Sequence, residues 1–196
     1  MKYIVGIDEA GRGPLAGPVA VGVVRIDAHF NRRFFRGIKD SKKLTEKNRE
    51  VWFELLKKRR KEGQIDYSVS LISEKIIDKR GIVYAINLGI NKCLTKLKIS
   101  KDSKIFLDGG IKAPADFIYQ KTIIKGDEKV AVISMASVCA KVTRDRYMVR
   151  LSKKYPKYGF DIHKGYGTLK HRQSIKKYGP SKVHRRSFLK NLVKEV

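Results

Sequence analysis

Residues 3–18, with the sequence YIVGIDEAGRGPLAGP, place a run of apolar residues directly before two carboxylates and a glycine-rich loop. The β-branched residues of 3–7 predict a short buried strand that ends where the glycines and prolines begin. Two carboxylates at the end of a buried strand are costly unless positive charge compensates them. Asp8 and Glu9 are therefore the first candidate functional residues.

Asp8 and Glu9 would face opposite sides of the sheet if the strand continued through both, because successive strand residues alternate. A site that uses both side chains requires the strand to break near Glu9. We expect this break, with the turn at Ala10–Gly11 carrying Glu9 back towards Asp8.

The charge balance indicates the class of partner. The 196 residues include 45 Lys and Arg against 19 Asp and Glu, a net charge of +26. The length suits one domain with a small appendage, and the 42% hydrophobic content supports a globular fold. A thermophile-type surface raises Lys and Glu together, which this sequence does not do. The basic excess favours nucleic acid as the partner over a surface that only confers solubility.

The sequence shows no pattern of secretion or membrane insertion. No signal-peptide pattern precedes Asp8, no lipidation motif is found, and uncharged runs such as 130–140 fall well short of the ~20 residues of a membrane span. Cys93 and Cys139 lie in apolar helical patterns, which predicts buried thiols in a reducing cytosol; a disulfide is the alternative. We expect a cytoplasmic protein, and the Cys and His spacings predict no zinc site.

The hydrophobic periodicity predicts an α/β fold. After the first strand, apolar patterns predict strands at 19–26, 65–71, 104–107 and 116–124, helices at 45–63, 81–98, 130–155 and 168–177, a loop at 159–167 and a basic tail at 181–195. Early strands joined by short loops, followed by strands alternating with helices, predict a mixed β-sheet with helices on both faces. Residues 1–155 would form this catalytic domain, and residues 156–196 a basic, helical, substrate-binding C-terminal extension.

Two further acids follow predicted strands. Asp108 directly follows the strand at 104–107, and Asp127 lies between the last strand and a buried helix. Strand ends and helix starts meet at one edge of an α/β sheet, so both would join Asp8 and Glu9 there. Hard divalent cations relieve the repulsion among such acids, and two of them ~3.5–4 Å apart stabilise in-line displacement at phosphorus. Taken singly, Asp108 could be only a turn residue and Asp127 only a helix cap.

Two loops are candidates for substrate recognition. In Gly11-Arg12-Gly13, the glycines allow close backbone approach and the arginine can clamp a phosphate, so the loop could contact the 2′-hydroxyl that distinguishes RNA from DNA. An ordinary tight hairpin loop is the alternative. Tyr166 lies in a glycine-rich basic loop, where it could stack on a sugar or base or dock into the core.

Further basic and polar residues are candidate phosphate contacts. Ser137, Lys141 and Arg144 share one helix face and could bind backbone phosphate, although Arg144 could instead pair with an acid. Lys42 and Lys43 are candidates in a loop that could equally be only solvated.

The order of these motifs resembles one known family. The blocks are residues 8–18 (DEAGRGPLAGP), 40–44 (DSKKL), 107–109 (LDG), 125–127 (KGD), 136–137 (AS), 140–145 (AKVTRD), 165–168 (GYGT) with His171, and 184–188 (HRRSF). They closely resemble the signature blocks of ribonuclease HII, the type 2 ribonuclease H, in the family's order and over nearly the whole chain.

The resemblance implies a ribonuclease H-like fold and endonucleolytic cleavage of RNA in RNA–DNA hybrids, with incision 5′ to single ribonucleotides in duplex DNA. It implies 5′-phosphate and 3′-hydroxyl ends, a role in ribonucleotide removal during DNA replication and repair, and two Mg²⁺ or Mn²⁺ ions. Asp8, Glu9, Asp108 and Asp127 match the family's metal-binding catalytic acids. Residues 11–13 match its junction-sensing loop, and Tyr166 matches its junction-stacking tyrosine.

The predicted substrates are therefore RNA–DNA hybrid and ribonucleotide-containing duplex DNA. We expect a monomer without membrane association, and recruitment by the replication machinery is a further hypothesis. The related ribonuclease HIII usually carries an extra N-terminal domain, which the position of the first strand argues against. Two alternative functions are a non-catalytic nucleic-acid-binding module, which would not need the acids, and a resolvase-like nuclease, which would ignore the 2′-hydroxyl.

Overall fold

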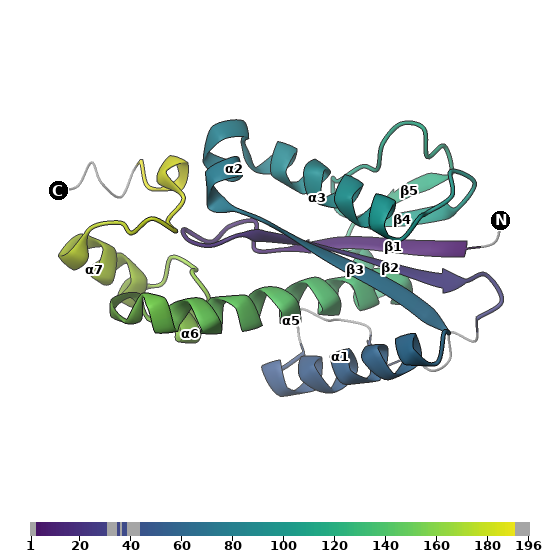
Figure 1. Cartoon of the computed structure of the whole chain (residues 1–196), viewed down its shortest axis with the longest axis horizontal. Helices are drawn as coiled ribbons and strands as arrows, with labels where there is room; N and C mark the ends of the chain where they lie inside the picture. Colours follow the sequence, from purple (N-terminus) through teal and green to yellow (C-terminus); the bar gives the residue numbers. More distant parts are fainter. Residues whose placement is uncertain (1–2, 31–34, 36, 39–43, 191–196) are drawn as a thin grey trace.

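A computed structural model describes residues 3–30, 35, 37–38 and 44–190. Its centre is a five-stranded sheet with the order β3-β2-β1-β4-β5 (Figure 1). The strands are β1 (Tyr3–Ala10), β2 (Val19–Asp27), β3 (Ile65–Ile72), β4 (Lys104–Asp108) and β5 (Gln120–Ile123). β1 pairs with β2 and β2 with β3 in antiparallel fashion, whereas β4 is parallel to β1 and β5 is parallel to β4. The predicted mixed sheet is confirmed.

Helices cover both faces of the sheet. They are α1 (Glu46–Lys61), α2 (Glu74–Arg80), α3 (Ile82–Lys96), α4 (Gly126–Lys129), α5 (Ala131–Lys154), α6 (Phe160–His163) and α7 (Leu169–Tyr178), with 3₁₀ turns at Pro156–Tyr158 and Arg186–Phe188. α2 and α3 lie on one face, and α5 and α1 on the other, while α6 and α7 lie beyond one end of the sheet (Figure 1). Thr45 caps α1 by accepting a hydrogen bond from the Asn48 N–H, as predicted. No helix in the described part of the chain combines the length and apolarity needed to cross a bilayer.

The strands direct apolar side chains to both faces of the sheet, where helices cover them. Val5 and Ile7 of β1 pack in the core under α3, whereas Val24 and Ile26 of β2 pack in the core under α5. Both cysteines are buried and unbridged, Cys93 in α3 and Cys139 in α5, as the sequence predicts.

The backbone of α5 touches the sheet directly. A Cβ atom at Gly6 would lie 2.1 Å from the Val132 carbonyl oxygen, and one at Gly22 would lie 2.3 Å from that of Ala136. Only glycine permits so close an approach, which explains why the first half of α5 is almost uncharged and mostly buried. The start of α5 is thereby fixed next to the end of β1.

Three expectations about the elements are wrong. β1 does not break near Glu9, because it pairs with β2 through Ala10. The strand predicted at 116–124 is only four residues long, Gln120–Ile123. The predicted loop at 159–167 contains the helical turn α6, which the left-handed residues Gly159 and Lys164 enclose.

A cluster of aromatic and histidine rings forms the core of the C-terminal region. Its members are Tyr158, Phe160, His163, His171 and His184; the rings of His163 and His171 stack at 4.3 Å, and that of Tyr158 lies 4.9 Å from that of His184. The bonds assign neutral tautomers. His171 Nδ1–H donates to the Tyr166 carbonyl (2.9 Å), and His184 Nδ1 accepts from the Ser181 N–H (3.0 Å). His184 Nε2–H therefore donates to His171 Nε2 (3.0 Å), and a further proton on His171 would place two N–H groups face to face.

We predict that the free energy of unfolding falls as the pH drops from 6.5 to 4. Burial lowers the pKa of His171 and of His184 to about 4 from the ordinary value of 6.5. Between these values the unfolded chain binds more protons, so each histidine removes ~1.4 kcal/mol per pH unit. Urea titrations at several pH values should show this slope. His184→Gln should flatten it and substitution of the exposed His29 by Gln should not; an equally flat wild-type profile would refute the neutral cluster.

Candidate active site

Three aspartates converge at the edge of the sheet. Ile7 of β1 pairs with Leu107 of β4 in parallel register, so Asp8 and Asp108 follow as neighbours. Asp127 comes from α4, and the N–H of Gly126 donates to Asp108 Oδ1 at 2.7 Å, which ties this turn to the end of β4. Each of the three carboxyl groups offers an oxygen within 4.8 Å of the other two. All three aspartates are buried.

This donor set fits divalent cations. Three buried carboxylates at such distances repel one another, and Mg²⁺ or Mn²⁺ prefers oxygen ligands of this kind. The three aspartates would hold the metal through their oxygen atoms. A bound divalent cation supplies a more acidic bound water and stabilises negative charge that develops on phosphate oxygens.

Glu9 stands apart from the aspartate group. Strand alternation turns it away from Asp8, because β1 continues through it opposite Val21. Its carboxylate forms an ion pair with Arg12 at 3.2 Å, and its side chain is 14% exposed. The fourth predicted acid therefore lines the same cleft as Asp8 without belonging to the group of three.

A cleft of about 400 Å³ lies beside the aspartates. It is lined by Asp8, Glu9, Ala10, Gly11, Arg12, Gly13, Arg49, Ser137, Lys141 and Tyr166. The predicted loop at 11–13 and the predicted Tyr166, which are far apart in the sequence, thus face one cavity. Tyr166 is 41% exposed, so it is available to a ligand and does not dock into the core.

The candidate phosphate contacts fall into three groups. Ser137 and Lys141 line the cleft, where Lys141 pairs with Asp145 at 2.9 Å and lies 5.5 Å from the ring of Tyr166. Arg144 is fully buried and donates to the carbonyl groups of Ala16, Pro18 and Lys164, so its predicted contact with phosphate is wrong. Lys42 and Lys43 lie outside the described residues.

Arg49 is a cleft residue that the sequence analysis missed. It lies in the first turns of α1, and its guanidinium donates to the Leu44 carbonyl. The start of a helix disfavours cations, because its free N–H groups carry positive partial charge. An arginine at that position was the signal available in the sequence.

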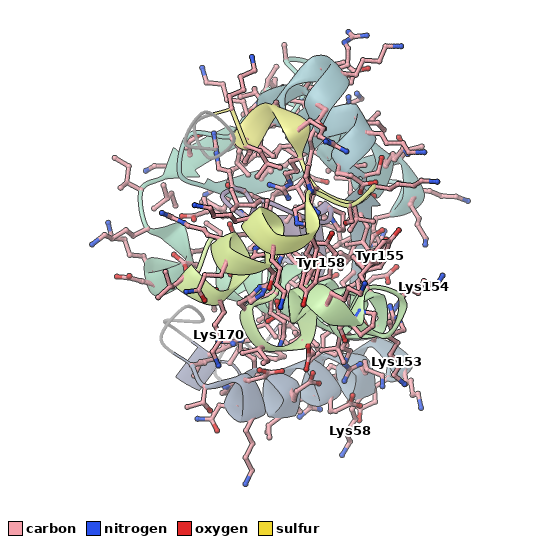
Figure 2. All side chains as sticks on the ribbon, turned by 90° about the vertical axis from the view of Figure 1, so that its left-hand side faces the viewer. Lys58, Lys153, Lys154, Tyr155, Tyr158 and Lys170 are labelled. Atoms are coloured by element: carbon pink, nitrogen blue, oxygen red, sulfur yellow. The ribbon has the colours of Figure 1, made fainter. Side chains whose placement is uncertain are left out.

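Lysine side chains lie at the end of the molecule that carries α6 and α7. Figure 2 looks onto this end and labels Lys153 and Lys154 at the end of α5 and Lys170 in α7. The net charge of +26 attracts a polyanion to the molecule, and Arg12, Arg49 and Lys141 supply positive charge in the cleft itself.

A mixed sheet with buried acids at neighbouring strand ends, beside a basic cleft, defines a metal-dependent nuclease of the ribonuclease H-like class. The model of the family described as Ribonuclease HII matches residues 5–191. A Ribonuclease HII from Caldicellulosiruptor bescii is 47% identical over 192 residues, which are 98% of this chain and 89% of the relative. The chain therefore belongs to the ribonuclease HII family. It is a hydrolase that cleaves RNA in RNA–DNA hybrids and acts on ribonucleotides embedded in DNA.

Solved structures agree with this assignment. The ribonuclease H2 from Pyrococcus horikoshii OT3 superimposes with a TM-score of 0.75 at 30% identity, with 98% of each chain covered. The RNase HII in a complex with PCNA from Archaeoglobus fulgidus gives a TM-score of 0.75 at 26% identity, with 94% of each chain covered. The predicted ribonuclease H-like fold is confirmed.

We predict that Asp127→Asn abolishes cleavage and stabilises the metal-free protein. Removing one of three mutually repelling charges should raise the free energy of unfolding in EDTA, by up to ~4 kcal/mol. The same variant should lose the increase in Tm that Mn²⁺ gives the wild type. Asp116→Asn, which changes an exposed acid, is the control. A variant that is less stable in EDTA and still gains stability from Mn²⁺ would contradict the proposed metal site.

Proposed function

We propose that Asp8, Glu9, Asp108 and Asp127 are the catalytic acids that bind two divalent cations for phosphodiester hydrolysis. The observation that carries the proposal is the group of three buried aspartates beside a cleft that also contains the loop at 11–13. The residues of this chain bind and orient the strand to be cut, and among the described residues no histidine lines the cleft as a general base. Hydrolysis 5′ to a ribonucleotide would leave 5′-phosphate and 3′-hydroxyl ends.

The ribonucleotide is proposed to be recognised by Gly11, Arg12, Gly13 and Tyr166. The first three offer backbone donors and a guanidinium, and the tyrosine offers a flat surface across the same cleft. Ser137, Lys141, Arg49, Lys42 and Lys43 are proposed to contact backbone phosphates on either side of the cleavage site. The segment 156–196 acts as a substrate-binding extension of the domain formed by 1–155.

Partners and cellular location are part of the proposal. The Archaeoglobus fulgidus relative was solved with PCNA, which supports recruitment of this enzyme by a replication clamp. We place the enzyme in the cytoplasm as a monomer, where ribonucleotide-containing DNA and reduced thiols are both found.

The first test uses duplex DNA with one embedded ribonucleotide, incubated with Mg²⁺. Wild type should cut on the 5′ side of the ribonucleotide, Asp8→Asn should be at least ~100-fold slower, and an all-DNA duplex should remain intact. Product ends are identified by gel mobility against synthetic standards. If the wild type binds the duplex without cutting it in Mg²⁺ or Mn²⁺, the protein is a binding module and the proposed reaction is wrong.

We predict that Arg12→Ala weakens discrimination for the ribonucleotide more than affinity for the duplex. Loss of the guanidinium removes a contact at the cleavage site, so kcat/KM on the ribonucleotide duplex should fall about tenfold or more. The Kd for an all-DNA duplex should change about threefold or less. Arg80→Ala, which removes an exposed arginine on α2, should change neither quantity. Equal losses on both duplexes would show that Arg12 contributes only general electrostatic attraction.

A further inference from the structure

A buried arginine lies directly beneath the glycine-rich loop. Arg185 is fully buried, and its guanidinium donates to the carbonyl groups of Gly11 (2.7 Å), Arg12 (2.9 Å) and Gly17 (2.9 Å). Burial, and secondly the charge of Arg144, lower the pKa of Arg185 to about 9, so it remains a cation at neutral pH. Three carbonyl groups of one loop thus compensate one buried charge.

The orientation of these carbonyl groups determines where the loop's donors point. In a planar trans peptide the C=O and the following N–H point in opposite directions. The carbonyl of Gly11 shares its peptide plane with the N–H of Arg12, and the carbonyl of Arg12 shares its plane with the N–H of Gly13. Because both carbonyl groups face Arg185, both N–H groups are directed away from it, on the side where these residues line the cleft.

His184, which precedes Arg185 in the sequence, is linked by hydrogen bonds to the Tyr166 side of the cleft. His184 Nε2–H donates to His171 Nε2 (3.0 Å), and His171 Nδ1–H donates to the carbonyl of Tyr166 (2.9 Å). This chain of hydrogen bonds restrains the backbone from which the Tyr166 ring projects.

Backbone hydrogen bonds also join the loop after β1 to the segment that contains His184 and Arg185. The N–H of Arg185 donates to the Leu15 carbonyl at 2.8 Å, and the N–H of Gly17 donates to the Val183 carbonyl at 2.9 Å. Ala16 and His184 form an isolated β-bridge, so the loop and the segment run side by side, as Figure 1 shows at the end of the sheet near α7.

We propose that His184 and Arg185 are positioning residues that set the ribonucleotide specificity of the enzyme. Arg185 orients the loop donors and His184 positions Tyr166, and neither side chain lines the cleft. Two consecutive residues therefore hold both elements that are proposed to recognise the ribose. This inference rests on the proposed role of the loop and of Tyr166.

The test measures binding to duplexes that differ by one 2′-hydroxyl. An Asp8→Asn background prevents cleavage, and fluorescence anisotropy in Mg²⁺ gives the Kd for a duplex with one ribonucleotide and for its all-DNA counterpart. The parent should prefer the ribonucleotide duplex. Arg185→Lys, which keeps the charge but cannot reach three carbonyl groups at once, should lose about tenfold of this preference, the equivalent of one hydrogen bond. Its affinity for the all-DNA duplex should change about twofold or less.

A matched control separates positioning from stability. Asp78 accepts hydrogen bonds from the backbone N–H groups of Arg186 and Ser187, so it anchors the same segment without touching the loop. Asp78→Ala should lower Tm, because the segment loses its anchor, and should keep the preference for the ribonucleotide. Arg185→Gln, which buries no charge and retains only one donating amide, provides the second variant at position 185 and should lose the preference at least as strongly.

The outcomes are distinguishable. If the Asp8→Asn parent shows no preference between the two duplexes, the proposed recognition of the ribose fails and the inference falls with it. If the parent shows the preference and both Arg185 variants keep it, the inference alone is wrong. The inference is also wrong if Asp78→Ala loses the preference as strongly as Arg185→Lys, because loosening of the segment then accounts for the loss.

Discussion

The whole arrangement depends on the direct contact between the backbone of α5 and the sheet at Gly6 and Gly22. This contact fixes the first turns of α5, and α4 with Asp127 immediately precedes them. A side chain at either glycine would push the helix away from β1 and would separate Asp127 from Asp8. The close packing of α5 on the sheet therefore also sets the spacing of the carboxylates.

The charge distribution combines two opposite requirements. The carboxylates concentrate negative charge in the interior, at a cost that only cations can offset, while the surface has a large positive excess. A small cation is attracted to the first and a nucleic acid to the second. Because the buried carboxylates and the basic surface are adjacent but separate, a metal ion and a nucleic acid can bind close together without competing for the same side chains.

The sequence predicts the fold well, because periodicity determines whether a segment becomes a strand or a helix. It correctly predicts that Asp8, Asp108 and Asp127 come together at one edge of the sheet. It fails to predict that β1 continues past Glu9, because pairing with β2 overrides the local preference of a glycine-rich turn. It fails at Arg144 because helix periodicity predicts which residues share a face but not what packs against that face. The carbonyl group of Pro18, which accepts a hydrogen bond from Arg144, comes from a distant part of the chain. Arg49 stands out in the sequence as a cation at a helix start, but only the folded chain shows that α1 reaches the cleft.

The contact of Arg185 with the loop at 11–13 joins two regions of this sequence that are synthesised far apart in time. During translation β1, β2 and β3 can pair early, and β4 completes the partners of β1 long before residue 185 leaves the ribosome. Until then the carbonyl groups of the loop have no guanidinium to face. The strands that carry Asp8 and Asp108 are therefore synthesised well before the residue that orients the loop, so the loop acquires its Arg185 contacts late in synthesis.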